Sequence, residues 1–462
     1  MIRIFRHYIP KSLFLLGVVE SFILLAAIWG GLSFRYIQAG LPVPIFLSNM
    51  MEIFSFVFVV YIVLLATGFY RQETCRDLKI TTIRLSTGLA LSFIVLSVIL
   101  YMLPEISLWR SVILYALFFS FTGLWVSRYI FLHIVDQGRL KKKVLVLGAG
   151  DRAERVRTCG ATEANDVEFV RFLRMNKKED TVQDAHDYDK NYLLKNYITD
   201  YAVQEIVVAI EERRGALPIE ELLECKMMGC RIIEATSFIE RQSGTVSLKN
   251  VNPSWLIFSD GFGNAGNFDS ILKRIFDVMA SGLLLTLSLP ILLVTALLVK
   301  MTSKGPVFYR QERVGLNGTT FNVLKFRSMT IDAEADGVPK WADKNDARVT
   351  ALGRVIRASR IDEIPQIFNV LGGAMSFVGP RPERPFFVEK LEKTINLYGE
   401  RHRVKPGITG WAQVNYPYGA SEEDTKRKLE YDLYYIKNYS MFLDFLILIQ
   451  TVRVVLWPDG VR

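Results

Sequence analysis

Long apolar runs separated by short polar segments dominate the first part of the chain. Four of these runs reach the roughly 20 residues that a helix needs to cross a bilayer. They cover residues 13–32, 47–70, 85–103 and 109–134. The pattern therefore predicts a membrane α-helical N-terminal bundle of four spans over residues 1–140.

The basic residues around these runs predict which side of the membrane each loop faces. Lys and Arg are concentrated before the first run, between the second and third, and after the fourth. The two other loops carry only Arg35 and Arg110. The positive-inside rule then places the N-terminus and everything after residue 140 in the cytoplasm. Glu20 lies inside the first run, where we favour a helix–helix hydrogen bond over a functional intramembrane acid.

The periodicity changes after residue 140, where short apolar runs alternate with amphipathic segments. The stretch KKKVLVLGAGDRAERV places Gly148 and Gly150 between an apolar strand and a helix, and the acids Asp166 and Glu168 follow. This arrangement resembles a Rossmann fingerprint, in which glycines let a phosphate approach a helix N-terminus. It predicts a Rossmann-like α/β module over residues 141–262. A dinucleotide site and a purely structural turn both stay open, and we favour the structural turn.

A fifth apolar run, residues 275–299, is long enough to span a bilayer but is flanked by basic residues at both ends. Pro290 interrupts this run and removes a backbone donor. The hydroxyls of Thr286 and Ser288 can hydrogen-bond the carbonyls that are freed. We therefore expect a re-entrant membrane helix that breaks at Ser288 and Pro290 and returns to the same face. An ordinary proline-kinked span is the alternative.

Two short strands are expected next, VFYRQERVG and TTFNVLKFRSM, joined by an Asn-Gly hairpin turn. The adjacent acids Asp362 and Glu363 follow in a segment rich in arginine. Ser359 and Asp362 fit a helix N-cap, so capping alone is a full structural explanation for Asp362. Arginines on both sides and the adjoining apolar run favour chemistry on phosphate instead.

The two neighbouring acids suit two different tasks. Adjacent helical side chains point about 100° apart, so these carboxylates are poorly placed to share one proton. We expect Asp362 to attack phosphorus and Glu363 to hold a Mg²⁺ ion that bridges a diphosphate. The predicted phosphate- and nucleotide-binding residues are the basic and amide side chains around this pair: Arg313, Lys325, Arg327, Arg357, Arg381, Arg384 and Gln413.

Composition narrows the range of partners. The chain has 462 residues, a net charge of +9 and 50% hydrophobic residues. Because the basic residues gather beside apolar runs, membrane lipid and phosphorylated substrates are favoured over nucleic acid. The four cysteines show neither a CxxC pair nor metal-ligand spacing, which indicates free thiols of a reducing compartment.

The motifs between residues 270 and 455 together resemble one bacterial family. They are KRxxD (Lys273, Arg274, Asp277), GPVFYRQERVG, KFRSM, LGRVIRASRIDEIPQIFNVL, GPRP, VKPGITGWAQVN and YDLYYIKNYS. This set is similar to that of the polyprenyl-phosphate hexose-1-phosphate transferases, or monotopic phosphoglycosyl transferases, and most similar to exopolysaccharide-system members. One departure is that Leu289 separates Ser288 from Pro290, whereas small members of the family often have Ser and Pro adjacent.

The resemblance implies a ping-pong reaction in a mainly α-helical (α+β) monotopic catalytic domain, residues 263–462. Asp362 would attack the sugar-bearing phosphate of a UDP-sugar, release UMP and form an aspartyl phosphosugar, which undecaprenyl phosphate then accepts. Glu363 maps onto the second acid of the family, associated with Mg²⁺. The resemblance also implies a multi-pass protein of the bacterial inner membrane with its catalytic domain on the cytoplasmic face. Such a protein starts exopolysaccharide, O-antigen or capsule synthesis and supplies downstream glycosyltransferases; homo-oligomerisation stays open.

Two other functions are open at this point. A membrane-anchored NAD-dependent nucleotide-sugar modifying enzyme would use Gly148 and Gly150, but the Tyr/Lys acid–base pair that it needs is not evident near them. A non-enzymatic membrane scaffold, whose α/β module senses a nucleotide, predicts that Asp362→Asn leaves function intact. The number of ordered motifs favours the transferase.

Overall fold

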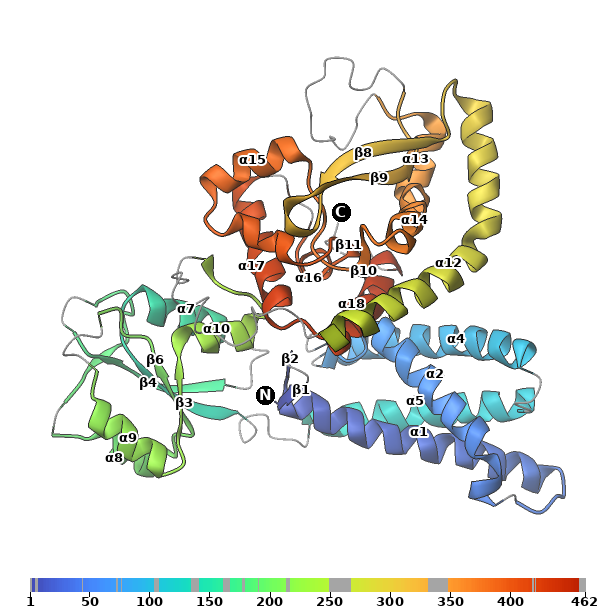
Figure 1. Cartoon of the computed structure of the whole chain (residues 1–462). Helices are drawn as coiled ribbons and strands as arrows, with labels where there is room; N and C mark the ends of the chain where they lie inside the picture. Colours follow the sequence, from blue (N-terminus) through green and yellow to red (C-terminus); the bar gives the residue numbers. More distant parts are fainter. Residues whose placement is uncertain are drawn as a thin grey trace. The chain divides into compact units, whose positions relative to one another are not determined.

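The computed structural model of the chain describes residues 2–4, 7–43, 45–71, 74–75, 77–103, 108–133, 141–160, 167–176, 179–189, 191–212, 217–248, 267–330, 348–417, 419 and 421–456. The chain divides into two compact units. The first is Met1–Gly244 with Ile449–Trp457, and the second is Thr245–Leu448 with Pro458–Arg462. Figure 1 labels the helices and strands of both units.

The first unit begins with apolar helices. A short antiparallel hairpin, β1 (Ile2–Ile4) and β2 (His7–Ile9), precedes them. The helices are α1 (Lys11–Gln38), α2 (Met50–Ala66), α4 (Leu78–Met102) and α5 (Arg110–His133), with the 3-10 turn η1 (Phe46–Asn49) before α2. Of these, α1, α4 and α5 are long and apolar enough to cross a membrane, in agreement with three of the predicted spans.

The second predicted span, residues 47–70, is wrong in its extent. Helix α2 has 17 residues, or about 26 Å at roughly 1.5 Å per residue, slightly less than the hydrocarbon core of a bilayer. The chain turns directly after it, and Gly68 has a φ of 77° in the left-handed region. A glycine there ends the helix although the apolar composition continues.

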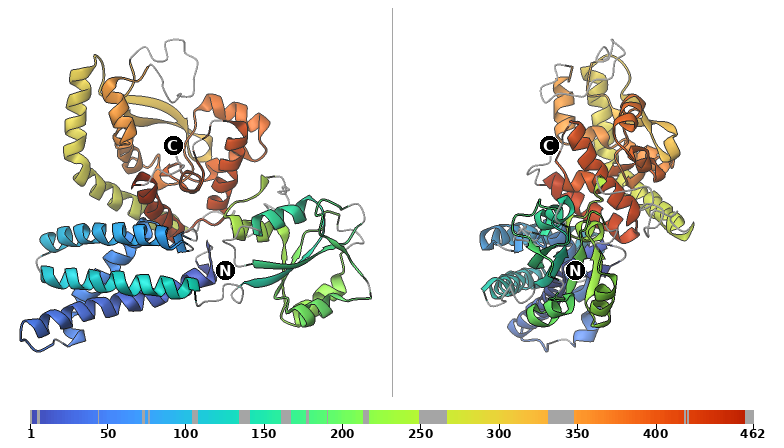
Figure 2. Two further views of the ribbon diagram at one scale, coloured as in Figure 1. Left: turned by 180° about the vertical axis from the view of Figure 1, so that it is seen from behind. Right: turned by 90° about the vertical axis from the view of Figure 1, so that its left-hand side faces the viewer.

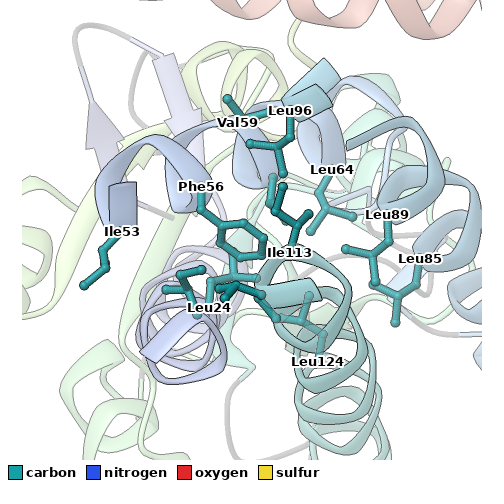
Figure 3. Packing of buried hydrophobic residues seen from close by; sticks show 14 of the residues in the cluster. Leu24, Ile53, Phe56, Val59, Leu64, Leu85, Leu89, Leu96, Ile113 and Leu124 are labelled. Carbon is teal, nitrogen blue, oxygen red and sulfur yellow. The ribbon is translucent and has the colours of Figure 1, made fainter. Parts of the chain in front are cut away.

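The four apolar helices share one hydrophobic core. Figure 3 shows side chains from all four meeting in it, among them Leu24 of α1, Phe56 of α2, Leu89 of α4 and Ile113 of α5. Leu24 and Phe56 are completely buried. Apolar residues on the other faces of these helices are exposed, as expected for helices surrounded by lipid.

A buried ion pair joins α1 to α5. Nε of Arg128 lies 2.7 Å from Oε1 of Glu20, and Nη2 of Arg128 donates to Oε2 of Glu20 at 3.2 Å. Both side chains are fully buried. The favoured helix–helix contact for Glu20 is therefore present, but its partner Arg128 was not predicted. A charged pair in such a place is expected to fix the register of the two helices.

A five-stranded parallel sheet follows the apolar helices. Its strand order is β5-β4-β3-β6-β7, with β3 (Lys142–Leu147) in the middle. The other strands are β4 (Val167–Arg174), β5 (His186–Asp187), β6 (Glu205–Val208) and β7 (Arg231–Glu234). The helices are α7 (Asp151–Gly160), α8 (Leu194–Tyr201), α9 (Ile219–Met227) and α10 (Ala235–Ser243). Figure 2 shows α7 and α10 on one face and α8 and α9 on the other, so the central strands are buried on both sides, which explains their continuous apolar runs.

Glu168, one of the two acids that follow the glycines in the sequence, does not complete a fingerprint in this module. Glu168 pairs in register with Lys143, near the amino end of β3, whereas Gly148 follows its carboxyl end. Along the strand, Lys143 and Gly148 are five residues apart, at roughly 3.3 Å per residue. Asp166 lies outside the described residues. Glu168 therefore does not lie where the acid of a Rossmann fingerprint lies, although the sequence spacing resembles one.

The second unit contains the long helix α12 (Asn267–Thr302). Its residues Asp269–Thr302 are long and apolar enough to cross a membrane. Figure 1 shows a strong bend in α12, and Pro290 is its one proline. Proline removes a hydrogen bond and clashes with the preceding turn, so it is the physical cause of such bends.

The hydroxyls before Pro290 do not act as predicted. Thr286 donates to the Gly282 carbonyl at 2.9 Å, and Ser288 donates to the Leu284 carbonyl at 2.6 Å. Both acceptors lie one turn before the donor. The carbonyl of Thr286, which Pro290 leaves without its usual donor, is not their partner.

The catalytic region predicted from sequence is mainly helical with small sheets. Strands β8 (Phe308–Val314) and β9 (Thr320–Phe326) form an antiparallel hairpin through η3 (Leu316–Gly318), and Asn317 and Gly318 have φ values of 53° and 78°. The Asn-Gly turn is therefore confirmed. The elements that follow are α13 (Ala351–Ala358), η5 (Ile361–Glu363), α14 (Gln366–Leu371), β10 (Ser376–Val378), α15 (Pro385–Thr394), η6 (Tyr398–Arg403), β11 (Gly407–Thr409), α16 (Trp411–Asn415), α17 (Glu422–Lys437) and α18 (Met441–Leu456).

Candidate active site

The two adjacent acids lie on the short 3-10 turn η5, between α13 and α14. Thr350 begins α13 by accepting a hydrogen bond from the Gly353 N–H at 2.9 Å. The helix ends at Ala358, and Arg360 then adopts a left-handed φ of 58°, which is uncommon for a residue other than glycine. This change of backbone direction means that Asp362 and Glu363 do not continue α13.

The N-cap at Ser359, which was the structural alternative for Asp362, is not present. Ser359 is the C-terminal cap residue of α13, and its hydroxyl donates to the Val355 carbonyl at 2.8 Å. The sequence pattern of a serine followed by acids resembles a helix start, but here it follows a helix end. Asp362 therefore does not serve as the first-turn acid of a helix capped by Ser359.

Glu363 is held by two cations from distant parts of the chain. Its Oε1 accepts from Nζ of Lys325 at 2.8 Å and from Nη2 of Arg381 at 2.7 Å. Its side chain is only 13% exposed. The burial of Glu363 by itself favours the neutral acid, but Arg381 and Lys325 outweigh it and hold the pKa of this carboxyl well below its usual range. Glu363 is therefore ionised at any physiological pH.

Asp362 has the opposite environment. It is 8% exposed, and its carboxylate has no hydrogen-bond or ion-pair partner in the part of the chain that the structure describes. Burial, and then the negative charge of Glu363, raise the pKa of Asp362. Lys325, Arg357 and Arg360 act against this rise. A carboxylate that is desolvated, surrounded by positive charge and not occupied by a donor is suited to nucleophilic attack.

Two other arginines build the loop that carries Arg381. Nη1 of Arg313 donates to the Pro382 carbonyl at 2.9 Å and reaches Oε2 of Glu383 at 3.3 Å. Nη2 of Arg401 donates to the Arg381 carbonyl at 2.8 Å. The structure thus places the predicted phosphate ligand Arg313 in a supporting position, where it fixes the backbone that presents Arg381.

The buried carboxylate of Asp432 holds Arg401 in turn, at 3.0 Å. Its removal from water raises the pKa of Asp432 to about 6, although Arg401 opposes the rise. Sequence reasoning did not identify Asp432 as a site residue. It lies 31 residues after Arg401 in the buried face of α17, and no local motif connects the two.

The remaining predicted ligands differ in their contacts. Arg357 is half-buried and has no hydrogen-bond or ion-pair partner among the described residues, so its guanidinium is available to an anion. Nη2 of Arg327 donates to the carbonyl and hydroxyl oxygens of Ser303, at the end of α12. Nε2 of Gln413 donates to the Ile408 carbonyl at 3.1 Å. Arg384 is the residue before α15.

The KRxxD motif connects the membrane helix α12 to the site. Nζ of Lys273 contacts Asp444 at 2.6 Å. The guanidinium of Arg274 donates to the last carbonyls of α14, those of Val370 and Leu371, both at 2.6 Å. Oδ1 of Asp277 accepts from the Phe377 N–H at 3.1 Å in β10. The Arg274 contacts fix α14, which follows the acids directly, against α12, and the other two fix α18 and β10 against it. The KRxxD motif is therefore part of the support of the site.

The comparisons with known proteins point to one family. Residues 268–458 match the family described as bacterial sugar transferase. A UDP-N-acetylgalactosamine-undecaprenyl-phosphate N-acetylgalactosaminephosphotransferase of Aeromonas hydrophila is 47% identical over 193 residues, 42% of this chain and 45% of that protein. A UDP-glucose:undecaprenyl-phosphate glucose-1-phosphate transferase of Caulobacter vibrioides is 41% identical over 190 residues, 41% of this chain and 71% of that protein.

A longer match includes part of the first unit. An undecaprenyl-phosphate glucose phosphotransferase of Komagataeibacter xylinus is 34% identical over 337 residues, 68% of this chain and 59% of that protein. The chain spans less than half the length of the Aeromonas relative but more than two thirds of the Caulobacter one. On this evidence the chain belongs to the bacterial sugar transferase family.

Proposed function

We propose that this protein transfers a hexose-1-phosphate from a UDP-sugar to undecaprenyl phosphate through a covalent intermediate on Asp362. The observation that carries the proposal is the contrast between two neighbouring carboxylates. Glu363 is ionised and bound by Lys325 and Arg381, whereas Asp362 is buried, unpartnered among the described residues and near three cations. The names of the relatives, which act on UDP-sugars and undecaprenyl phosphate, give the substrate class.

In the first half-reaction, an Oδ of Asp362 attacks the phosphorus that carries the sugar. The bond between this phosphorus and the bridging oxygen breaks, and UMP leaves with the bridging oxygen. The product is an aspartyl phosphosugar. Arg357 and Arg360 are the cations near Asp362 that have no hydrogen-bond or ion-pair partner among the described residues, and they suit the negative charge on the transferred phosphate.

In the second half-reaction, a phosphate oxygen of undecaprenyl phosphate attacks the same phosphorus. The bond to Asp362 breaks, the carboxylate is restored, and undecaprenyl diphosphate sugar is released. A carboxylate whose pKa is raised is a better nucleophile than an ordinary one because its proton affinity is higher. Glu363 keeps Lys325 and Arg381 in place through both steps.

The donor set is compatible with the expected Mg²⁺ ion. No group of three or more His, Cys, Asp and Glu side chains that would hold a metal occurs in the described ranges. Mg²⁺ is commonly held by one or two carboxylates together with substrate phosphates. Oε2 of Glu363 and the oxygens of Asp362 accept no hydrogen bond from the described residues, so these hard oxygen ligands are free for such an ion. When bound, Mg²⁺ would neutralise the charge that develops on the diphosphate.

We also propose that α12 enters the membrane and returns to the cytoplasmic face. Both of its ends are hydrogen-bonded to the same compact domain, through Lys273 at one end and through Ser303, directly after α12, at the other. This arrangement supports re-entry over a crossing, because a crossing helix would separate its two ends by the thickness of the bilayer. The protein would then work at the inner membrane, start exopolysaccharide or a related polymer, and deliver its product to downstream glycosyltransferases.

Release of UMP from a panel of UDP-sugars, with undecaprenyl phosphate present, tests the proposal. Peptide mass spectrometry after incubation with donor alone should find a hexose-phosphate adduct on Asp362. Asp362→Asn should give neither adduct nor UMP. Asp184→Asn is the matched control, because Asp184 is 89% exposed and outside the catalytic domain, and it should behave as the wild type. An adduct or full turnover in Asp362→Asn would overturn the mechanism.

A further inference from the structure

The glycine-rich turn between β3 and α7 is already occupied by carboxylates of the chain. The Ala149 N–H donates to Oε2 of Glu179 at 3.1 Å, and the Asp151 N–H donates to Oε1 of Glu211 at 2.7 Å. The other oxygen of Glu179 accepts from the Glu211 N–H at 3.0 Å. In a dinucleotide-binding turn, backbone N–H groups at this place point at the pyrophosphate. Here two of them have an anionic acceptor within the protein.

The glycines of the turn are explained by contacts inside the module. A Cβ on Gly150 would lie 2.5 Å from Oε1 of Glu211, so the absence of a side chain makes room for this carboxylate. Gly148 has a φ of 125°, and a Cβ there would lie 2.7 Å from the carbonyl carbon of Ala209, just after β6. Neither glycine needs a phosphate to account for it.

The segment that carries Glu179 is firmly attached to the turn. Glu179 is only 5% exposed. The N–H groups of Thr181 and Val182 donate to the Ala149 carbonyl at 2.9 and 3.0 Å. Nε of Arg174 donates to the Glu179 carbonyl at 3.0 Å. The carboxylate is therefore held over the turn by the backbone that follows it and by the Arg174 side chain.

The ribose hydroxyls of a dinucleotide would also lack the acidic residue that usually binds them. In the fingerprint, an acid beyond the glycines binds the ribose hydroxyls. At the carboxyl end of β4 this chain has Arg174, and its guanidinium is bound by Asp180 and Asp187 at 2.5 and 2.9 Å. Glu168 is at the opposite end of β4.

We infer that this turn is closed by the chain's own glutamates and takes no dinucleotide. Glu179 and Glu211 perform the structural task of a bound pyrophosphate, because they join the start of α7 to the chain beyond the ends of β4 and β6. A pyrophosphate would have to displace both carboxylates and would meet their negative charge. The α/β module is then a self-liganded scaffold, and the NAD-dependent activity considered for it is excluded at this turn.

Hydrogen exchange measured on the whole 462-residue chain tests this inference at the level of the two amides. The N–H groups of Ala149 and Asp151 should be protected in the wild type, and millimolar NAD⁺ should leave their exchange unchanged. Glu211→Ala should speed the exchange of Asp151 on the order of tenfold, because it removes a hydrogen bond to a charged acceptor. Glu211→Gln keeps an acceptor oxygen and is the matched control, with exchange close to that of the wild type.

Two results would overturn the inference. One is fast exchange of both amides in the wild type that becomes slow only when NAD⁺ is added. The other is unchanged exchange of Asp151 in Glu211→Ala. Because exchange is read at the Ala149 and Asp151 amides, nucleotide binding at the catalytic domain does not affect the result. If a variant fails to fold, the exchange of these amides in the wild type, with and without NAD⁺, is sufficient to test the inference.

Discussion

Replacing Asp362 by asparagine should stabilise the protein while it abolishes turnover. The pKa of this carboxyl is raised above its ordinary value of 3.8 by burial and by Glu363. A carboxyl group whose pKa is higher in the folded than in the unfolded chain destabilises the fold at neutral pH, because ionisation is less favourable in the folded state. Asparagine has nearly the same shape and no charge, so the substitution removes this cost.

The magnitude follows from the contacts of Asp362. An unsatisfied buried group costs about 1–3 kcal/mol when it is neutral and more when it is charged, so asparagine removes only the excess that belongs to the charge. Lys325, Arg357 and Arg360 offset part of this excess, so the expected gain is about 1 kcal/mol. For a domain of this size, such a gain corresponds to a rise of about 2–4 °C in the midpoint of thermal unfolding. If Asp362 were a helix cap instead, its loss would cost about 0.5–2 kcal/mol, and the midpoint would fall.

Thermal unfolding in one detergent, without donor, measures the difference between the two proteins. The advantage of Asp362→Asn should shrink as the pH is lowered through the pKa of Asp362, because the wild-type carboxyl then becomes neutral as well. Glu363→Gln is the opposite control: Lys325 and Arg381 hold the pKa of this carboxyl below its usual range, so its ionised form stabilises the fold at neutral pH and its loss should lower the midpoint. A lower midpoint for Asp362→Asn than for the wild type would refute the reasoning.

Three further perturbations test other parts of the structure. Because the pKa of Asp362 is raised, the yield of aspartyl adduct in a single turnover should fall as the pH is lowered through that pKa; a yield that is constant over the acid range would contradict this. Glu363→Gln removes the charge that holds Lys325 and should lower the unfolding midpoint by the equivalent of about 1–3 kcal/mol, measured beside Glu363→Asp, which keeps the charge. Glu20→Gln leaves Arg128 buried without a counter-charge and should cost about 3–5 kcal/mol, and Glu20→Gln combined with Arg128→Met should recover most of the loss in the same unfolding assay. No recovery in the double variant would mean that the ion pair is not the source of the loss.

The sequence predicted those elements of the fold that are determined by residues close together in the chain. The hairpin turn at Asn317 and Gly318 requires two residues in the left-handed region, and Asn-Gly is the dipeptide that tolerates it. The apolar runs of α1, α4 and α5 likewise indicate their helices, since an 18-residue apolar stretch has few other stable forms in a membrane. The end of α2 was missed because one glycine, Gly68, terminates the helix inside a run that is still apolar.

Contacts between distant segments explain what the sequence did not predict. The partner of Glu20 is 108 residues away in α5, and no periodicity within α1 points to it. The left-handed conformation of Arg360 separates α13 from the acids, so a serine-plus-acid pattern that resembles a helix start marks a helix end. A pattern of three or four residues can identify a helix boundary, but it does not show whether the boundary ends one helix or begins the next.

The division of tasks between Asp362 and Glu363 follows from such long-range contacts. The two side chains are adjacent in the chain, and their residue types alone give no reason for different acidities. Lys325 reaches Glu363 from 38 residues earlier, and Arg381 reaches it from 18 residues later. Both cations contact the same oxygen of Glu363, and neither forms a hydrogen bond or ion pair with Asp362. A sequence can therefore identify the acid pair. The hairpin β8–β9 and the GPRP loop supply the cations, and so they decide which acid is ion-paired and which one stays available for attack.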